Sequence, residues 1–482
     1  MIVGELRHGQ LVIIDRLRET VRLSEGLEKT GELSEAACER ALECLSRFGE
    51  RLRDMRASSV RAAGTSTLRR ASSNREFRDR AERALGHPIE VISGIEEARL
   101  IYTGVLHSLP PHTGYRLVLD IGGGSTELIL GEGAVTKRLE SLHLGCVSMT
   151  ERFFPDGRIT HAAFDKARIA ARLELRPVKA FFRNYVDAQV IGTSGTITST
   201  EAVGRLSGIV ETAGLTPQAV EALISKVVEL GHISELSLPG LSDRRAQVWP
   251  GGLAILVELL HSLRIPRLHI SDGALREGLL YELIGRLQHE DARERSVRAM
   301  AARYHVDEQQ AERVAQSAKR LLAQCRADWD LGSELAAKML DWAARLHEIG
   351  LDISHDGFQR HGAYVAANAD MPGFPWTEQA MLAYLIASQR RHFDKRELDR
   401  VPASWQIKGQ RLAILLRLAV LLNRNRSSEA ATELALDASD DSLRLVFQRD
   451  WLDDNPLTLA DLQRERGYLE AIGYMLNVDT AG

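Results

Sequence analysis

Apolar positions recur with two different periods before about residue 290. Short apolar or alternating runs, such as residues 2–6, 11–16 and 117–121, have the pattern of β-strands. Between these runs, apolar residues return at steps of three and four, as between Cys38 and Met55, which is the spacing of one buried helix face. Strands that alternate with helices predict an α/β architecture. This alternation of strands with helices occurs twice along the chain, which indicates a duplicated fold around a cleft.

The pattern changes near Asp291, where glycine-bearing turns become rare and helical spacing dominates. We therefore expect residues 287–422 to be all-helical. Strand-like alternation returns at residues 434–447 and predicts a small domain of mixed helices and strands at residues 423–482.

One turn between two apolar runs contains three consecutive glycines, Gly122, Gly123 and Gly124. Glycines weaken strands, so such a run makes sense if the backbone must approach a ligand and present N–H groups to an anion. The polar residues at the mouth of the turn could donate to phosphate or hold a divalent cation or water: Asp120, Ser125, Thr126 and Glu127. The alternative is a structural hairpin turn whose polar residues satisfy one another.

Composition narrows the class of protein. A chain of 482 residues with 44% hydrophobic and 27% charged residues is typical of a soluble globular protein with several domains. The net charge of −4 offers no general field for nucleic acid, so an anionic substrate would be held by local arginines. The four cysteines lack CxxC spacing, which argues against a zinc site or a disulfide framework and favours a reducing cytoplasm.

Membrane and export signals are absent from the sequence pattern. The first ten residues have no basic region followed by a long apolar run, so we expect no signal peptide. The longest apolar stretch, residues 412–422, is interrupted by Arg417 and is too short to span a bilayer. We expect a cytoplasmic protein, and peripheral attachment to the inner face of the cell membrane stays open.

Seven sequence blocks carry a resemblance to a known family: GTSTLRRA (64–71), ISGIEEARLIYTGV (92–105), LVLDIGGGSTELILG (117–131), LGCVSMTERFFP (144–155), GTSGT (192–196), SDGALREGLLYE (271–282) and LHEIGLDISHDGFQRHGAYVAANADMPGF (346–374). In this order they resemble the exopolyphosphatase/guanosine pentaphosphate phosphatase family over essentially the whole chain. The resemblance implies two actin-like, ribonuclease H-like domains at residues 1–101 and 102–286. It also implies an all-α, degenerate HD-like domain at 287–422 and a small α+β domain at 423–482.

The resemblance implies that Glu97 is the base that activates an attacking water, with Glu127 as a second catalytic carboxylate. Spacing alone does not separate Glu97 from Glu96. A pair of glutamates at a helix start is also explained by a favourable interaction with the helix dipole.

The implied phosphate-binding residues lie in two glycine turns: Gly122, Gly123, Gly124, Ser125 and Thr126 in the first, and Ser194, Gly195 and Thr196 in the second. Further substrate contacts are implied for Arg69, for Arg245 in an expected loop at residues 236–250, and for Cys146, whose alternative role is packing. Asp120 and Glu127 are the candidates to hold Mg²⁺, with a stimulatory monovalent cation as a further expectation.

The helical part has a rival interpretation as a metal-dependent HD phosphohydrolase. His347 is followed by Glu348 where such sites need an aspartate, and Gln310 stands where their first histidine is usual. His355, His361 and His392 do not occupy matching positions. We therefore expect a degenerate HD-like fold that serves packing, dimerisation or binding of a long substrate chain.

The start of the chain departs from the family pattern. Members open with a strand and an Asp-x-Gly-Ser-Asn-Ser hairpin, whereas residues 2–6 match the strand that follows it. The first domain would then lack a central strand and half of the phosphate clamp. We expect an in-frame Asp-x-Gly-Ser-Asn-Ser upstream of Met1 in the coding sequence, the alternative being a poorly folded and inactive form.

Three functions are compatible with these residues. The first is an exopolyphosphatase that releases terminal orthophosphate from inorganic polyphosphate by direct, Mg²⁺-assisted water attack. The second is a phosphatase of guanosine pentaphosphate, although the helical part resembles exopolyphosphatases more. The third is a non-catalytic sensor of polyphosphate or guanosine polyphosphates. The resemblance further implies a homodimer.

Overall fold

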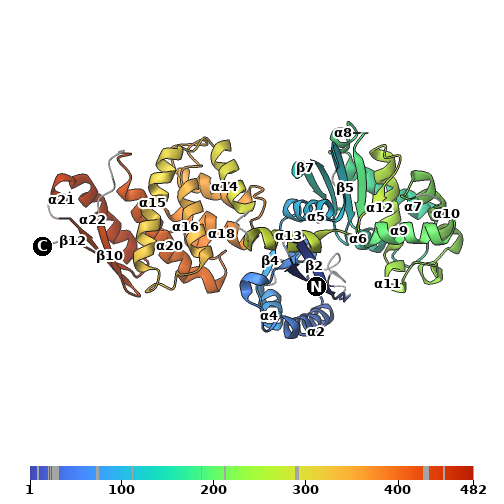
Figure 1. Ribbon diagram of the computed structural model, residues 1–482, viewed down its shortest axis with the longest axis horizontal. Coiled ribbons are helices and arrows are strands. Elements are labelled where there is room, and N and C mark those ends of the chain that lie inside the picture. Colours follow the sequence, from blue (N-terminus) through green and yellow to red (C-terminus); the bar gives the residue numbers. More distant parts are fainter. Residues whose placement is uncertain are drawn as a thin grey trace. The chain divides into compact units, whose positions relative to one another are not determined.

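The computed structural model describes the chain except residues 8–9, 20, 22, 24–31, 72–74, 111, 186, 211–212, 288–291, 427–433, 449–450 and 481–482. The chain divides into two compact units, Met1–Glu290 and Asp291–Gly482 (Figure 1). The first unit is α/β and the second is mainly helical, as the change of pattern near residue 291 predicts. The finer division of the chain into four domains stays a prediction.

A five-stranded sheet organises the first unit. Its strands lie in the order β7 (Val135–Leu142), β6 (Thr126–Glu132), β5 (Tyr115–Ile121), β8 (Gln189–Thr193) and β9 (His269–Ile270). Strand β8 runs parallel to β5 and to β9, whereas β6 is antiparallel to β5 and β7. The carboxyl ends of β5 and β8 therefore lie at the same edge of the sheet, and each is followed by a glycine turn.

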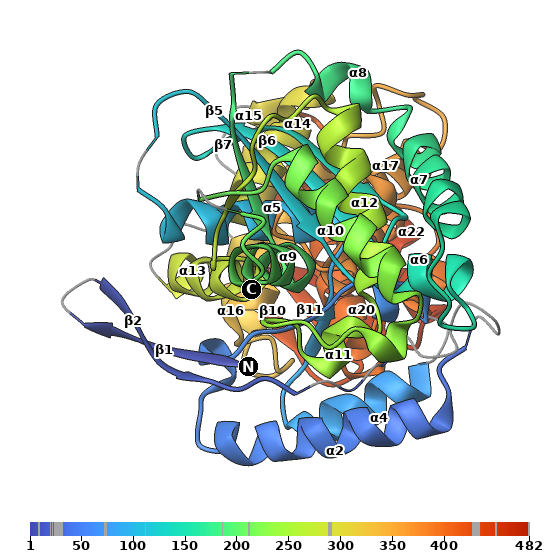
Figure 2. The same cartoon turned by 90° about the vertical axis from the view of Figure 1, so that its right-hand side faces the viewer.

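The central strands are buried on both faces because their apolar side chains alternate between two cores. Val118, Ile129 and Ile191 pack on the face covered by α5 (Gly94–Ser108). Leu117, Leu119 and Leu128 pack on the opposite face, in a core that includes α12 (Trp249–Ser262). Figures 1 and 2 show helices on both sides of β5. Every residue of α12 from Trp249 to Leu260 is buried, which explains its apolar sequence.

The described part of the first unit has further helices, most of which pack against α12: α6 (Cys146–Phe153), α7 (His161–Leu175), α8 (Lys179–Phe182), α9 (Gly195–Leu206), α10 (Pro217–Leu230) and α11 (Asp243–Ala246). Thr160 caps α7 and Thr216 caps α10, as their sequences predict. Residues 236–250 are not all loop, because Ser242 caps the single turn of α11 and α12 begins at Trp249.

The first 92 residues form a smaller layer with two short two-stranded sheets. Strands β1 (Ile2–Arg7) and β2 (Gln10–Arg16) pair as an antiparallel hairpin, and β3 (Ala62–Gly64) pairs in parallel with β4 (Ile89–Val91). Helices α2 (Glu35–Leu52), α3 (Ser66–Arg70) and α4 (Arg75–Leu85) complete this part. Cys38, Ala41 and Leu52 of α2 pack in its core, as their spacing predicts.

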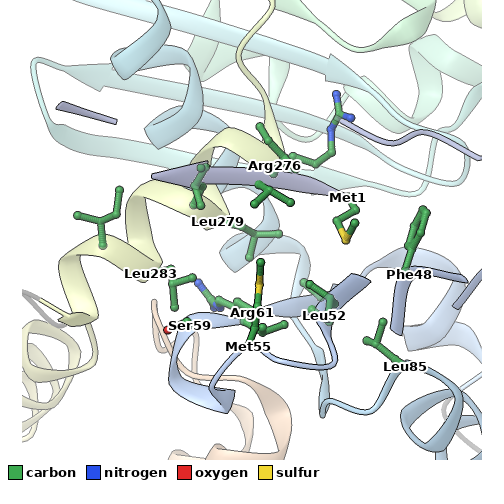
Figure 3. Close-up of a pocket in the computed structure, with 18 of the residues that line it drawn as sticks. Met1, Phe48, Leu52, Met55, Ser59, Arg61, Leu85, Arg276, Leu279 and Leu283 are labelled. Carbon is green, nitrogen blue, oxygen red and sulfur yellow. The ribbon is translucent and has the colours of Figure 1, made fainter. Parts of the chain in front are cut away.

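A cavity of about 740 Å³ lies between the two small sheets (Figure 3). Its lining includes Ile2 and Val3 of β1 and Ala62 of β3, with Phe48 of α2. Within the described chain, β1 pairs only with β2, and β3 only with β4. Each strand therefore leaves one edge unpaired. The strand upstream of Met1 that the family resemblance implies stays a prediction.

Helices α5 and α13 (Leu275–Leu287) cross at a very short distance because both carry a glycine at the crossing. A Cβ atom on Gly278 would lie 1.8 Å from the carbonyl oxygen of Leu100, and one on Gly104 would lie 2.0 Å from that of Ala274. Neither carbonyl can move away without breaking its helix, so glycine is required at both positions.

We expect the substitution Gly278→Ala to destabilise the protein by about 1–3 kcal/mol, the usual cost of overpacking. Gly467→Ala is the matched control, since Gly467 is also helical and its added Cβ would meet no atom within 4 Å. Thermal denaturation of the two variants measures the difference. An equal or smaller loss of stability in Gly278→Ala would contradict the close crossing.

The second unit is a helical bundle followed by a three-stranded sheet. Its longer helices are α14 (Ala292–Arg303), α15 (Glu308–Cys325), α16 (Glu334–Leu346), α17 (Phe358–Asn368), α18 (Trp376–Ser388), α20 (Ala403–Leu422) and α22 (Pro456–Glu470). Two single turns are α19 (Lys395–Leu398) and α21 (Trp451–Asp454), and the sheet has β10 (Leu434–Ala438), β11 (Ser442–Phe447) and β12 (Met475–Thr480).

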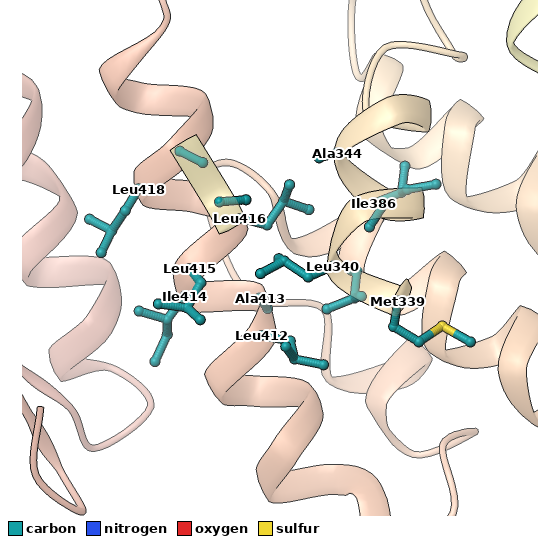
Figure 4. Close-up of a cluster of buried hydrophobic side chains, with 14 of the residues drawn as sticks. Met339, Leu340, Ala344, Ile386, Leu412, Ala413, Ile414, Leu415, Leu416 and Leu418 are labelled. Atoms are coloured by element: carbon teal, nitrogen blue, oxygen red, sulfur yellow. The ribbon is translucent and has the colours of Figure 1, made fainter. Parts of the chain in front are cut away.

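One hydrophobic core runs through this whole unit. Leu412 and Leu416 of α20 point toward Leu340 of α16 and Ile386 of α18 (Figure 4). The inward residues of β11, among them Leu445, belong to the same core. The alternation in residues 434–447 is therefore a strand pattern that covers the helical bundle. Among the described residues, no helix is long and apolar enough to cross a membrane.

Candidate active site

The three-glycine turn connects the carboxyl end of β5 to β6. The strand register places Asp120 opposite Glu127 and Ile121 opposite Thr126, and the amide of Gly122 donates to the carbonyl of Ser125 at 2.9 Å. The two carboxylates that flank the turn in the sequence thus lie beside each other across the hairpin.

The first turn of α6 holds the glycine turn in place. The amides of Cys146 and Val147 donate to the carbonyls of Gly122 and Gly123, each at 2.9 Å. A Cβ atom on Gly145 would lie 2.2 Å from the carbonyl oxygen of Gly123, so this approach also requires glycine. The hairpin turn and a helix N-terminus therefore form one fixed assembly of backbone groups.

Three buried carboxylates converge below the turn. Burial, followed by the charge of the nearby Glu97 carboxylate, raises the pKa of Asp120 to about 7. Burial, followed by the charges of Glu97 and Asp120, also raises the pKa of Glu127 well above its usual range, against the effect of the Ser125 and Ser141 hydroxyls. Burial raises the pKa of Glu97, which the Arg69 guanidinium opposes. A cluster of acids with raised pKa values is characteristic of catalytic sites.

The structure separates Glu97 from Glu96, which the sequence does not. Both lie in the first turn of α5, where Ser93 caps the helix. Glu96 accepts two hydrogen bonds of 2.8 Å from the guanidinium of Arg99 and lies 3.8 Å from that of Arg61. Glu97 instead faces the other two carboxylates, and its Oε2 accepts from Arg69 Nη1 at 2.9 Å. Glu96 is committed to ion pairs, whereas Glu97 lies at the candidate site.

The second glycine turn follows β8 and begins α9. Ser194 has a left-handed φ of +89°, which is strained for a residue with a side chain, and its buried Oγ has no protein partner. Arg245 lies against this turn, because a Cβ atom on Gly195 would come within 2.0 Å of its Nη2. The Cys146 thiol is nearby, and its pKa is raised by burial and lowered by the Thr196 hydroxyl and the Arg245 charge.

A cavity of about 980 Å³ lies over the two turns. Its lining includes six of the predicted site residues: Gly122, Gly123, Cys146, Ser194, Gly195 and Arg245. It also includes Arg18, Arg244 and Gln247, which the sequence did not single out. Arginines and glycine-turn amides on one cavity are suited to a substrate with several phosphoryl groups.

Three of the side chains predicted to bind phosphate form hydrogen bonds with protein groups instead. The Thr126 hydroxyl is fully buried and donates to the carbonyl of Leu144 at 2.5 Å. The Ser125 hydroxyl is directed to Glu127. Arg69 donates from Nη1 both to Glu97 and to the carbonyl of Ile92, each at 2.9 Å. In this structure these three side chains support the carboxylates and the turn.

Two supporting residues were missed by sequence reasoning. Ser141 of β7 lies opposite Glu127 in the strand register and donates its hydroxyl to Glu127 Oε1 at 2.9 Å. The Thr65 side chain hydrogen-bonds to Glu97. Only strand pairing and tertiary packing bring them to the site. Thr65 lies within the family-like block 64–71, which was the one available signal.

The carboxylate cluster suits a divalent cation. In the part of the chain that the structure describes, Arg69 is the one ion-pair partner of these three buried acids. Their ionised forms therefore leave an excess of negative charge that a cation would neutralise. Yet among the described residues, no three His, Cys, Asp or Glu side chains are grouped closely enough to enclose a metal ion. A cation held here would take most of its ligands from water and substrate oxygens, as Mg²⁺ commonly does.

In the second unit, the polar groups of the expected HD-like centre bond to the protein itself. The His347 ring is buried, its Nδ1 lies 2.6 Å from the carbonyl of Ala344, and burial lowers its pKa. Gln310 Nε2 donates to the carbonyl of Asn423 at 2.8 Å, and Glu348 accepts from Arg426 at 2.5 Å. His355 and His392 contact the rings of Phe358 and Tyr468.

Family models match both units of the chain. Residues 2–287 match the Ppx/GppA phosphatase family, and residues 292–466 match Ppx/GppA phosphatase, domain III. A Vibrio cholerae protein named guanosine-5'-triphosphate,3'-diphosphate pyrophosphatase is 38% identical over 99% of this chain and 95% of its own length. A protein of the same name from Aeromonas hydrophila is 37% identical over 98% of this chain and 95% of its own.

Solved structures agree with the fold. The Aquifex aeolicus member of the Ppx/GppA family has a TM-score of 0.50 and 29% identity, over 60% of this chain and 94% of that one. An exopolyphosphatase from Cytophaga hutchinsonii has a TM-score of 0.53 and 24% identity, over 59% of this chain and 94% of that one. The second likeness concerns the fold alone.

The fold and the family matches over both units define a hydrolase of the phosphatase class with actin-like architecture. The chain belongs to the Ppx/GppA phosphatase family. Like the members of this family, it acts on phosphoric anhydrides.

Proposed function

We propose that this protein removes the terminal phosphoryl group of guanosine pentaphosphate, guanosine 5'-triphosphate 3'-diphosphate, by direct attack of water. The choice of substrate rests on the curated relatives, whose name, guanosine-5'-triphosphate,3'-diphosphate pyrophosphatase, contains this nucleotide and which match nearly the whole chain. The sequence interpretation put inorganic polyphosphate first, and that activity remains the second candidate because both belong to the same family.

The proposed chemistry follows from the placement of Glu97. Its carboxylate would accept the proton of a water molecule as the water oxygen forms its bond to the terminal phosphorus. The phosphoanhydride bond then breaks, and the bridging oxygen leaves with the rest of the nucleotide. A pKa raised by burial makes Glu97 a stronger base near neutral pH than an exposed glutamate.

The charge of the transferred group would be balanced by fixed donors. The amides of Gly123 and Gly124 and the guanidinium of Arg245 are suited to phosphoryl oxygens, since backbone N–H groups and arginine bind phosphate without reorganising, whereas the Gly122 amide is bonded to Ser125 within the turn. Asp120 and Glu127 would hold Mg²⁺, which when bound neutralises phosphoryl oxygens and helps orient the substrate. Arg18 and Arg244, which also line the cavity, would bind the phosphates farther from the reacting group.

Phosphate release from guanosine pentaphosphate and from long-chain polyphosphate, at equal concentrations of chain ends and with Mg²⁺, tests this proposal. We expect a higher kcat/KM for the nucleotide, with the tetraphosphate as its product on anion-exchange chromatography. A preference for polyphosphate would replace the proposal by exopolyphosphatase activity. Binding of either substrate without release of phosphate would identify a sensor.

A further inference from the structure

A second cavity rich in arginine lies in the unit Asp291–Gly482, formed by the residues that follow α18, the last turns of α20 and helix α22. It has a volume of about 240 Å³ and is lined by five arginines and two carboxylates. None of these groups belongs to the carboxylate cluster or the glycine turns of the first unit. We call this cavity the arginine pocket.

The two carboxylates of the arginine pocket are already occupied. Glu465 accepts hydrogen bonds from Nε and Nη2 of the buried Arg417, at 2.5 and 2.9 Å. Asp461 accepts from Arg424 Nη1 at 2.6 Å and lies 3.7 Å from Arg464. The pocket therefore carries three positive charges more than negative ones.

Two neighbouring arginines account for much of this excess. Neither Arg390 nor Arg391 makes an ion pair among the described residues. The guanidinium of Arg390 stacks on the ring of Phe358, 5.1 Å from its centroid, and its Nε is buried without an acceptor. Burial, then the charges of Arg424 and Arg391, lowers its pKa. A buried donor without a partner is destabilising, so an acceptor at this place would bind favourably.

Two further features of the pocket concern Gln389 and Arg391. The side chain of Gln389 is only 2% exposed and lines the pocket; its Oε1 atom has no partner, but as an acceptor it needs a donor and does not itself attract an anion. Arg391 has a left-handed φ of +60°, and its carbonyl accepts from Arg417 Nη2 at 2.7 Å.

We propose that the arginine pocket is a second anion site, which binds one or two phosphoryl groups of a free or nucleotide-linked diphosphate. Its volume fits a group of that size. Guanidinium groups bind phosphoryl oxygens with paired hydrogen bonds, and a doubly charged phosphoryl group matches the excess charge better than one carboxylate would. This site is distinct from the catalytic one and does not depend on the proposed function.

Titration calorimetry of the full chain with inorganic pyrophosphate tests the proposal. The Glu97→Gln background slows turnover by about a hundredfold to ten-thousandfold and so preserves the ligand during the titration. We expect two binding sites per chain, and Arg390→Gln should weaken one of them about tenfold to a hundredfold, the factor that one charge-assisted hydrogen bond supplies. Arg444→Gln is the matched control, because Arg444 is an exposed arginine of the same unit paired with Asp479.

A second measurement separates binding from folding. Because Arg390 is an unpaired, partly buried charge, Arg390→Gln should not lower the Tm in anion-free buffer. Titration with guanosine diphosphate distinguishes a free diphosphate from a nucleotide-linked one. If guanosine diphosphate binds more tightly than pyrophosphate does, the ligand is a nucleotide. Whatever the number of sites before substitution, pyrophosphate binding that is unchanged in Arg390→Gln, or equally weakened in Arg444→Gln, would overturn the proposal.

Discussion

Replacing Glu97 by Gln lowers kcat by about a hundredfold to ten-thousandfold, the contribution of a well-placed general base. The amide keeps the shape of the side chain and can still accept from Arg69 Nη1, but it cannot take a proton from water. Binding of substrate should persist, because the amides of the glycine turn and Arg245 are untouched. Steady-state kinetics and calorimetric titration of the same variant measure the two effects.

Glu96→Gln is the control for this experiment, since it changes the adjacent residue of the same helix turn. Glu96 is 1% exposed and holds Arg99 with two hydrogen bonds, so its loss should destabilise the fold by about 3 kcal/mol, as for other buried pairs that lose one partner. Its kcat at a temperature where it is folded should remain near that of the unaltered protein. A large loss of kcat in Glu96→Gln with none in Glu97→Gln would reverse the assignment.

The buried pair of Arg417 and Glu465 has the largest expected effect on stability. Arg417 interrupts the apolar stretch of α20, is 2% exposed, and donates to Glu465 and to the carbonyls of Ser388 and Arg391. We expect Arg417→Met to destabilise the second unit by about 3–5 kcal/mol, because it leaves a buried carboxylate without a partner. Denaturant unfolding followed by tryptophan fluorescence measures this, since five of the six tryptophans lie after residue 291.

The double variant Arg417→Met/Glu465→Leu distinguishes lost pairing from lost packing. If the cost arises from the unpaired carboxylate, the double variant should recover a large part of the stability, because an apolar pair needs no solvation. A double variant no more stable than Arg417→Met would mean that the aliphatic and ring contacts of Arg417 with Phe393 and Tyr468 carry the effect. A loss below about 1 kcal/mol in the single variant would contradict the buried pair.

Local patterns predicted the elements that carry the site. Two short apolar runs predicted strands β5 and β6 on either side of the glycine turn, and their pairing places Asp120 beside Glu127. The cap residues Thr160 and Thr216 also begin helices as predicted. These features depend on residues that are only a few positions apart in the chain, so the sequence is enough to predict them.

Side-chain partners were harder to predict where they lie far apart in the chain. Thr126 was expected to face phosphate, but its hydroxyl is directed to the carbonyl of Leu144, which follows β7. The support of Glu127 by Ser141 needs the pairing of β6 with β7. The arginine pocket joins residues about 70 positions apart, and neither its charge excess nor its unpaired guanidinium appears in any local pattern.

The hairpin with three glycines, the α/β order and the helical second unit all follow from the sequence alone, because strand alternation, helix spacing and glycine geometry are local properties. The choice between Glu96 and Glu97 required the tertiary structure. Adjacent helix residues point about 100° apart, and only packing determines which direction meets Arg99 and which meets Asp120. Tertiary packing therefore turned one of two equivalent glutamates into the candidate base and the other into a structural ion pair.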